Sequence, residues 1–457
     1  MDVNCLVVVD DNKSNDRLVL LAFKDGITQD PLGILSSWNN NNDSLHFCQW
    51  IGVACSSRHP SRVATLNLGS QKLLGSISPD IGNLSFLKDL NLANNSLNGE
   101  IPQQIGRLSR LKNLDFSYNF LEGEIPETIS RCSNLIKLKM SNNKLVGSIP
   151  NDLGNLSDLA TLELSSNNLS VDIPTSLGNF SSLTFLNLQY NNLEGRIPNT
   201  LSQLTSLKYL ILDSNRLSGI VPSPLYNISS LQLFSLSDNQ LHGSIPFDIG
   251  FTLPNLIYFS IGRNNFTGSI PSSISNISRL DILQLHGNNL VGAVPYNLGY
   301  LTSLTNLYLA ENELGHGQAN DLNFFDSLIS CTNLLFIGVS NNNLGGVIPS
   351  SIAKLTANLA ELDLGGNLIH GNIPTGIQNL VGLTRLSLSN NLLAGSIPPV
   401  IGNLQNLRVL DFRHNKFSSS IPSSFGNLTQ LVQLLLNDNN LTVSIPLSLE
   451  YCESLQI

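Results

Sequence analysis

The sequence has few charged residues, no long apolar run and no grouping of residues typical of an active site. Charged residues make up 12% of the 457 residues and the formal net charge is −9, so the basic stripe that nucleic-acid binding demands is missing. The chain also lacks the roughly 20 apolar residues of a membrane span. Its seven histidines include no pair at metal-ligand spacing, and GHGQAN lacks the strand, third glycine and helix of a dinucleotide loop. We therefore expect no catalytic residue, metal site or cofactor.

The sequence is dominated instead by an internal repeat of about 24 residues. The copy LKDLNLANNSLNGEIPQQIGRLSR begins at Leu87, and the same pattern restarts at similar intervals as far as Leu431. With a divergent first copy that begins at Val63, residues 63–454 contain sixteen repeats, and residues 455–457 begin a further one. One copy cannot bury its apolar side alone, so the copies are expected to stack into an elongated solenoid.

Each copy has the residues that a short strand followed by a sharp bend requires. Leu90 and Leu92 alternate with polar residues, and a period of two places both leucines on the core side. Asn95 follows at the bend, where its amide can donate to and accept from the backbone of its own turn and of the neighbouring coil. Gly99 tolerates a sharp turn, and Pro102 stops the strand from extending. The rest of the copy predicts a short helical or 3₁₀ turn.

One repeat is longer than the others. The step from Leu304 to Leu334 is 30 residues, because the Ile-Pro step is lost and residues 315–330 are inserted. The insertion contains apolar residues at helical spacing, and Asn320 or Asp321 could cap the start of a helix. The predicted helical face comprises Leu322, Phe325, Leu328 and Ile329. We expect a longer helix on the convex side, and both a role in binding and a tolerated loop remain open.

The repeat consensus LxxLxxLxLxxNxLxGxIPxxLxxL resembles the plant extracellular type of leucine-rich repeat from Val63 to the end. This resemblance implies an α/β solenoid, a right-handed leucine-rich-repeat superhelix with a parallel β-sheet on the concave face and 3₁₀ or short helical turns on the convex face. Residues 16–62, with NDRLVLLAFKDGITQDPLGILSSWN and CQWIGVAC, resemble the N-terminal cap of plant leucine-rich-repeat receptors; residues 1–15 are unassigned. The cap resemblance implies a disulfide between Cys48 and Cys55, and with it an oxidising compartment.

Three stretches, DLxFxxSLxxCTxL, ITQDPLGILSSWN and GSISPDIGNLSFL, are similar to the receptor-kinase subfamily that includes the elongation-factor-Tu receptor. Members of that subfamily have a signal peptide, this ectodomain, one membrane helix and a cytoplasmic Ser/Thr kinase. The resemblance implies a plasma-membrane protein whose ectodomain faces the apoplast. The start MDVNCLVVVDD lacks the basic residues and long apolar run of a secretory signal, and the span and kinase are absent, so we expect a fragment or a truncated product.

The other cysteines and the glycosylation sequons are spread along the repeats. Cys132, Cys331 and Cys452 each stand three residues before a repeat-opening leucine and are expected to be buried thiols, whereas Cys5 has no evident partner. Besides Asn12, sequons that could carry glycans are Asn42, Asn83, Asn94, Asn155, Asn168, Asn179, Asn227, Asn265, Asn276, Asn427 and Asn440. Six of them share one register away from the strand, and Asn94 alone lies beside its solvent face, so glycans would leave the concave sheet almost bare.

The residue before the second leucine of each strand should face solvent on the concave surface. In the first five copies this residue is polar, and in the last four it is mostly polar. In the seven copies between them it is apolar or aromatic six times: Phe185, Tyr209, Leu233, Tyr258, Ile282 and Phe336, with Asn306 as the exception. Neighbouring positions add Ile211 and Tyr308, with Tyr190, Arg263, His286 and Asp363 as polar groups. Such an apolar ridge is typical of a binding surface, although side chains that only stiffen the sheet would give the same pattern.

These features predict an extracellular ligand-recognition domain of a plant receptor-like kinase. We expect it to bind a microbial or endogenous peptide on the concave ridge and to pair with a co-receptor in immune signalling. A charged cluster near the end lies where family members face a co-receptor, although it could be ordinary solvated charge: Glu361, Asp363, Arg385, Asp411, Arg413 and His414. The alternative is a soluble interaction protein, either an inhibitor of pathogen wall-degrading enzymes or a kinase-less decoy. Neither reading makes this chain an enzyme.

Overall fold

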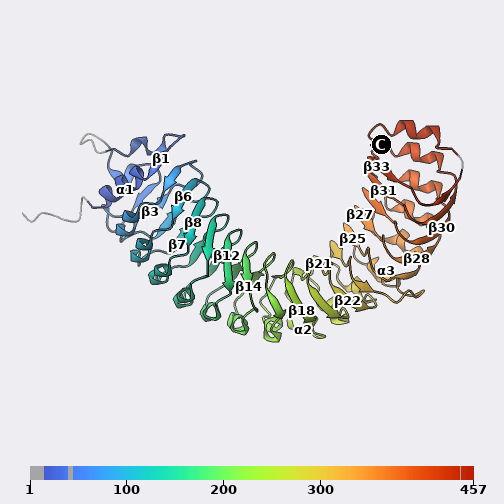
Figure 1. Cartoon of the computed structure of the whole chain (residues 1–457), viewed down its shortest axis with the longest axis horizontal. Helices are drawn as coiled ribbons and strands as arrows, with labels where there is room; N and C mark the ends of the chain where they lie inside the picture. The colour runs from blue at the N-terminus through green and yellow to red at the C-terminus, as the bar shows by residue number, and fades with distance from the viewer. Residues whose placement is uncertain (1–14, 40–44, 443, 457) are drawn as a thin grey trace, which may run out of the picture. The chain divides into compact units, whose positions relative to one another are not determined.

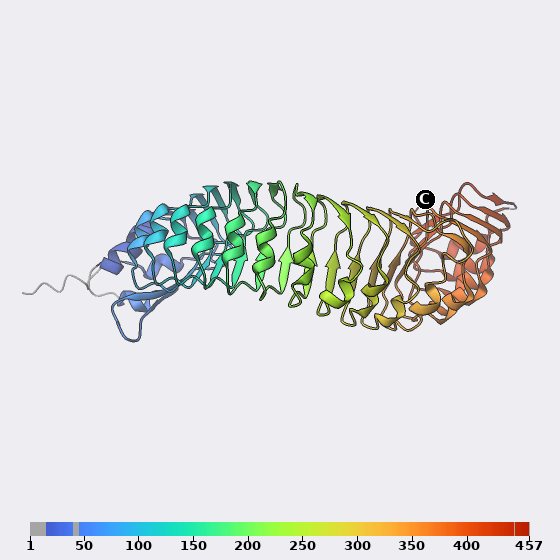
Figure 2. The ribbon, with the colours of Figure 1, turned by 90° about the horizontal axis from the view of Figure 1, so that it is seen from below.

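The computed structural model describes residues 15–39, 45–442 and 444–456, in two compact units, Met1–Leu217 and Ser218–Ile457. Both units are stacks of similar coils (Figure 1). Within each unit, every coil contributes one short strand to a main parallel sheet, and most add a second strand to a smaller sheet and a 3₁₀ helix to the remaining side. Figure 2 shows these short helices following one another along the first unit. The predicted leucine-rich-repeat solenoid is confirmed.

The first unit begins with helix α1 (Asn15–Asp25). Its main sheet consists of β2 (Val53–Cys55), antiparallel to its neighbour, and the parallel strands β3 (Val63–Asn67), β5 (Asp89–Asn91), β7 (Asn113–Asp115), β9 (Lys137–Lys139), β11 (Thr161–Glu163), β13 (Phe185–Asn187) and β15 (Tyr209–Ile211). Its second sheet consists of β1 (Ile27–Gln29), also antiparallel, and β4 (Leu74–Ser76), β6 (Ser96–Glu100), β8 (Phe120–Glu124), β10 (Lys144–Gly147), β12 (Asn168–Asp172) and β14 (Asn192–Glu194). Its 3₁₀ helices are η1 (Ile34–Ser37), η2 (Phe47–Gln49), η3 (Pro79–Asn83), η4 (Gln103–Arg107), η5 (Glu127–Arg131), η6 (Asn151–Asn155), η7 (Thr175–Asn179) and η8 (Asn199–Gln203).

The second unit repeats this plan. Its main-sheet strands are β17 (Leu233–Ser235), β19 (Tyr258–Ser260), β21 (Ile282–Gln284), β23 (Asn306–Tyr308), β25 (Phe336–Gly338), β27 (Glu361–Asp363), β29 (Arg385–Ser387), β31 (Val409–Asp411) and β33 (Gln433–Leu435). Two further five-stranded sheets consist of β16 (Ser218–Ile220), β18 (Gln240–Ser244), β20 (Asn265–Gly268), β22 (Asn289–Gly292) and β24 (Glu313–Leu314), and of β26 (Gly345–Val347), β28 (Leu368–Gly371), β30 (Leu392–Ser396), β32 (Lys416–Ser419) and β34 (Asn440–Leu441). Its helices are η9 (Ser223–Asn227), α2 (Ile249–Thr252), η10 (Ser272–Asn276), η11 (Leu298–Tyr300), α3 (Phe325–Leu328), η12 (Ser350–Lys354), η13 (Thr375–Asn379), η14 (Pro399–Asn403), η15 (Ser423–Asn427) and η16 (Leu447–Tyr451).

The core of each coil is built from the positions that the repeat predicts. Leu90 and Leu92, which flank half-buried Asn91 in the sequence, are 1% and 0% exposed. Asn95 Nδ2 donates to the carbonyl of Leu92 in its own turn at 3.0 Å and to the carbonyl of Leu68 in the preceding coil at 2.8 Å. Its Oδ1 accepts the amide N–H of Leu73, in the preceding coil, at 3.0 Å. Equivalent asparagines repeat this arrangement in both units, so the predicted asparagine ladder is confirmed.

The N-terminal cap covers the first coil of the first unit. Cys48 and Cys55 form the expected disulfide, with Cα atoms 5.4 Å apart. Asp16, which is 1% exposed, accepts the Val63 amide N–H at 2.8 Å and the Arg62 Nε–H at 3.2 Å. A buried carboxylate with a cation and a backbone donor is fully satisfied, and it fixes helix α1 to the start of strand β3.

The insertion does not form the longer helix that the sequence predicts. Helix α3 has four residues, begins after Phe324 and has no side-chain cap. Asp321 is buried, and its Oδ2 accepts the amide N–H groups of His316, Gln318 and Gly345, so it fixes the insertion to the next coil and caps nothing. Leu322, Phe324, Phe325 and Leu328 are buried, whereas Ile329, predicted on the buried face, is 37% exposed. A few residues of turn and one short helix therefore bury these apolar side chains.

Cys132, Cys331 and Cys452 are buried free thiols, as predicted. Each Sγ donates to a carbonyl of the preceding coil; for Cys132 the acceptor is the Ile105 carbonyl at 3.3 Å. The expectations for Cys5, Asn12 and Asn42 lie outside the described residues. None of the helices in the described part of the chain has the length and hydropathy of a transmembrane segment.

Candidate ligand-binding site

Four of the six apolar residues of the predicted ridge lie in line on the exposed face of the main sheet of the second unit. Consecutive strands pair Leu233 with Tyr258, Tyr258 with Ile282, Ile282 with Asn306, and Asn306 with Phe336. Parallel pairing in one register places these side chains side by side, because every residue between two core leucines points away from the core. We call the line formed by Leu233, Tyr258, Ile282 and Phe336, interrupted by Asn306, the ridge.

The first unit carries the remaining apolar residues of the prediction on its own sheet. Phe185 and Tyr209 are register partners on β13 and β15, and their ring centroids are 5.6 Å apart. Ile211 pairs with Asn187 on the same two strands. Tyr190 lies beyond the end of β13, is 59% exposed, and has a left-handed backbone with φ 53°. A tyrosine at a positive φ is strained, so packing of the coil holds it there.

Aromatic side chains at and beside one end of the ridge pack against one another. All the ridge residues are half-buried. The rings of Tyr308 and Phe336 are stacked, with centroids 4.2 Å apart and an interplanar angle of 30°. The His286 ring follows at 6.3 Å from Tyr308. Mutual packing stiffens the surface, and a stiff apolar surface loses little conformational entropy when it binds.

Two glycines that the sequence analysis did not single out shape this surface. A Cβ on Gly338 would lie 2.7 Å from Cε1 of Phe336, and a Cβ on Gly262 would lie 2.6 Å from Cε1 of His286. Each ring therefore lies over a position where any side chain would displace it. For Gly338 the signal available in the sequence was a glycine in a column otherwise filled by side chains, whereas the column of Gly262 also contains Gly69 and Gly365.

The polar groups around the ridge form local pairs. Tyr258 Oη donates to Gln284 Oε1 at 2.7 Å, and Ser260 Oγ donates to the same oxygen at 3.0 Å. Arg263 forms an exposed ion pair with Asp238 at 3.6 Å, which contributes little to stability. Burial lowers the pKa of His286, and the positive charge of Arg263 lowers it further, against the opposing effects of Glu311 and Asp238.

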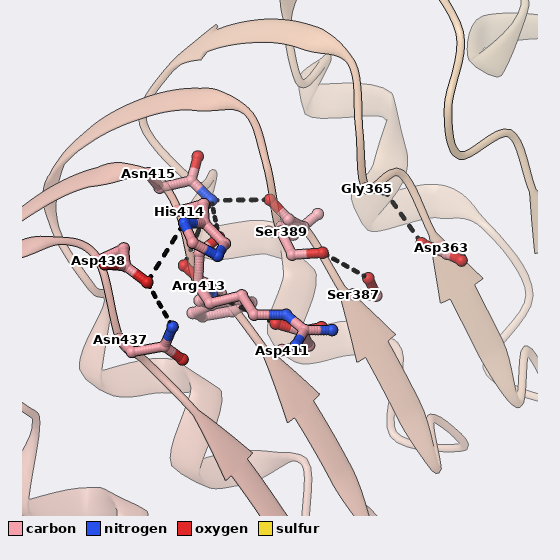
Figure 3. Close-up of polar contacts among 12 residues, drawn as sticks. Asp363, Gly365, Ser387, Ser389, Asp411, Arg413, His414, Asn415, Asn437 and Asp438 are labelled. Atoms are coloured by element: carbon pink, nitrogen blue, oxygen red, sulfur yellow. Dashed lines mark hydrogen bonds and ion pairs between the residues drawn. The ribbon is translucent and has the colours of Figure 1, made fainter.

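Part of the charged cluster near the C-terminal end forms ion pairs (Figure 3). Asp411, which is 3% exposed, binds Arg413 at 3.1 Å, and His414 Nδ1 lies 3.3 Å from Asp438. Asp363 Oδ1 accepts the Gly365 amide N–H at 3.0 Å. Glu361 and Arg385 are register partners on β27 and β29, yet neither forms an ion pair with any described residue.

The described sequons occupy two kinds of position. Asn83, Asn155, Asn179, Asn227, Asn276 and Asn427 are each the last residue of a 3₁₀ helix; all are exposed except Asn83, which is half-buried. Asn168, Asn265 and Asn440 are the exposed first residues of strands outside the main sheet. Asn94 is exposed beside the main sheet, and its Nδ2 donates to Ser70 Oγ at 2.9 Å. In the described part of the chain, no cluster of three or more His, Cys, Asp or Glu side chains has the arrangement of a metal site.

Three family models match the sequence. The model described as leucine rich repeat N-terminal domain matches residues 13–56, and the model described as leucine-rich repeat region matches residues 54–192. The model described as Leucine Rich Repeat matches residues 182–204, 206–228, 255–277, 333–355, 358–380, 382–404 and 406–428.

Similar proteins are plant receptor kinases. The receptor kinase-like protein Xa21 of Oryza sativa subsp. japonica is 44% identical over 79 residues, which cover 17% of this chain and 8% of that protein. The LRR receptor-like serine/threonine-protein kinase EFR of Arabidopsis thaliana is 46% identical over 78 residues, which cover 17% of this chain and 7% of that protein. The matched segments thus span less than a tenth of these relatives.

Solved structures extend the similarity to nearly the whole chain. The LRR ectodomain of the Arabidopsis receptor kinase HAESA, in complex with an IDA peptide hormone ligand, has a TM-score of 0.66 and 30% identity, covering 97% of this chain and 85% of that one. The plant peptide hormone receptor RGFR1, in complex with RGF2, has a TM-score of 0.78 and 35% identity, covering 86% and 61%. The chain therefore belongs to the leucine-rich-repeat family, in the form found in the ectodomains of plant receptor-like kinases.

Proposed function

We propose that this chain is the ligand-recognition part of a plant receptor-like kinase and binds an extended peptide along the ridge. The observation that carries the proposal is the line of apolar side chains, interrupted by Asn306, that lie in one register on the solvent side of the main sheet. An extended peptide that crosses parallel strands meets one such side chain per strand, about every 4.8 Å. The peptide complexes of HAESA and RGFR1 support a ligand of this class.

The subfamily, setting and partners are part of the same proposal. We place the chain in the subfamily that includes the elongation-factor-Tu receptor, at the plasma membrane with the repeats facing the apoplast, in immune signalling. Residues 16–62 form its cap and residues 63–454 its repeats. A co-receptor would dock near the last repeats; the receptor kinase HAESA has been solved with both the peptide hormone IDA and the co-receptor SERK1. Glycans on the 3₁₀-helix asparagines would leave the ridge accessible.

A double substitution on the ridge tests peptide binding. A random dodecapeptide library is panned against the wild type, against Tyr258→Ala with Phe336→Ala, and against Tyr296→Ala with Phe247→Ala. The control also removes one tyrosine and one phenylalanine side chain, but outside the main sheet, where Tyr296 is 76% exposed and Phe247 is 84% exposed. We expect enriched peptides to bind the wild type and the control alike and to lose at least about tenfold in affinity for the ridge variant, because truncated interface anchors cost about 1–2 kcal/mol each.

Circular dichroism confirms that the variants are folded. Equal peptide affinity for a folded ridge variant would exclude the ridge as the site. If no peptide were enriched on the wild type, peptide binding would be rejected in favour of the soluble interaction protein, whose partner would be a folded protein.

A further inference from the structure

The Tyr308 and Phe336 rings stack on each other and form an aromatic surface at the end of the ridge. Phe336 lies over Gly338, where a Cβ would meet its ring edge at 2.7 Å, and Tyr308 stacks on it at 4.2 Å. Tyr308 and Gly338 are register partners, so the Phe336 ring is held over a gap in the column of side chains. The ring orientation is thereby fixed before any ligand arrives.

The next strand places two carboxylates beside this aromatic surface. Strand β27 pairs Glu361 with Phe336 and Asp363 with Gly338, so both carboxylates point to the same side of the sheet as the rings. Adjacent strands are about 4.8 Å apart, which is within the reach of one planar group that touches a ring with its face and a carboxylate with its edge. Both acids are half-buried.

Two other acids on the main sheets are neutralised by cations, whereas Glu361 and Asp363, like Asp89 and Asp115, form no ion pair with any described residue. Glu163 pairs with Lys139 at 3.2 Å and Asp411 with Arg413 at 3.1 Å. Among the described residues, the Glu361 carboxylate has neither a hydrogen bond nor an ion pair, and the Asp363 carboxylate accepts only the Gly365 backbone N–H, which leaves its second oxygen open. Arg385, on the next strand, is the register partner of Glu361 and could neutralise it. Its guanidinium nevertheless forms no ion pair with any described residue.

We propose that Tyr308, Phe336, Glu361 and Asp363 bind one arginine side chain of the ligand. An arginine fits because its guanidinium is planar, stacks on an aromatic face and presents N–H groups along its edge to carboxylates. The ammonium of lysine is a compact, strongly hydrated charge and matches the flat rings less well. The net charge of −9 favours the approach of a basic partner. This inference rests on the proposed function in assigning the arginine to a peptide, but the side-chain site stands on its own contacts.

The test uses acetyl-arginine amide, with acetyl-citrulline amide as its neutral analogue of the same shape, observed by saturation-transfer NMR. The variant Glu361→Gln with Asp363→Asn removes both carboxylate charges and keeps the side-chain sizes. The matched control, Glu313→Gln with Asp326→Asn, removes the same two charges at exposed positions outside the main sheet. We expect the arginine amide to bind the wild type and the control equally, and to bind the site variant at least about tenfold more weakly. The citrulline amide should bind none of them measurably.

Absence of arginine-amide binding to the wild type, or equal binding to the site variant, would overturn the proposal. The peptide library separates this result from the proposed function. Enriched peptides without a preference for arginine would reject the arginine site while peptide binding stands. A library with no enriched peptides, together with carboxylate-dependent binding of the arginine amide, would keep the site and reject the peptide ligand.

Discussion

Replacing Asn143 by alanine removes one rung of the asparagine ladder in the first unit. Asn143 Nδ2 donates to the carbonyls of Phe116 at 3.0 Å and Met140 at 3.2 Å, and Oδ1 accepts the Leu121 amide N–H at 3.0 Å. Both carbonyls keep another asparagine as donor in the variant, but the Leu121 N–H loses its acceptor. A buried unsatisfied donor costs about 1–3 kcal/mol, and the weakened carbonyl bonds add less. We expect Asn143→Ala to lower the free energy of unfolding by about 2–3 kcal/mol.

Guanidinium unfolding followed by circular dichroism measures this loss, and hydrogen exchange locates it. Stability in a solenoid is a sum over coils and their neighbours, so the amide of Leu121 should lose protection while distant coils keep theirs. Asn199→Ala is the control: Asn199 is exposed, and the change should stay within about 0.5 kcal/mol. A loss from Asn143→Ala no larger than the control, with Leu121 still protected, would refute the assigned role of the ladder.

Asn143→Asp gives the same site a pH dependence with a definite sign. The carboxylate keeps an acceptor for Leu121 but faces the Phe116 and Met140 carbonyls, which favours the protonated form and raises its pKa in the folded state. The unfolded value is about 3.9, so the folded state binds the proton more tightly. The deficit relative to wild type is therefore complete above the folded pKa and shrinks as the pH falls toward the unfolded pKa. Unfolding at pH 7 and pH 4 measures the deficit, and a larger deficit at pH 4 would contradict this reasoning.

Three further outcomes follow from single contacts. Asp321→Ala should open the insertion, with faster exchange at Gly345 and a loss of about 2–4 kcal/mol, because three backbone N–H groups lose their acceptor; unchanged exchange would contradict the assigned anchor. Gly338→Ala should displace the Phe336 ring, seen as a change in near-ultraviolet circular dichroism without loss of secondary structure, since the added Cβ would lie 2.7 Å from the ring. Burial raises the pKa of Cys132 to about 11, so at pH 8 the thiol is protonated and iodoacetamide should modify it only after unfolding; peptide mass spectrometry reads this directly.

The insertion shows where reasoning from sequence reached its limit. Leu322, Phe325 and Leu328 were predicted to be on a buried face and are buried, whereas Ile329, predicted on the same face, is 37% exposed. The predicted long helix was wrong because Asp321 accepts an amide N–H from Gly345, 24 residues away, and that contact favours a compact turn. The local spacing of apolar residues cannot predict a contact between coils.

The sequence also did not predict which charged residues form ion pairs. Asp363 and Asp411 occupy the same position in coils two repeats apart, and the sequence assigns them the same place on the sheet. In the structure Asp411 is 3% exposed and paired with Arg413, whereas Asp363 keeps an open oxygen beside the aromatic surface. Side-chain packing decides which charge is neutralised, and packing depends on neighbours in two other coils.

The sequence by itself determined the repeat, the buried leucines, the asparagine ladder and the register of the ridge, because each copy must satisfy the same backbone and core demands at the same positions. Only the tertiary structure decided how far the ridge side chains are buried, that the Phe336 ring lies over Gly338, and that Glu361 is left without a cation. The reason is physical: the periodicity fixes which way each side chain points, whereas its rotamer and its partners depend on the side chains of adjacent coils.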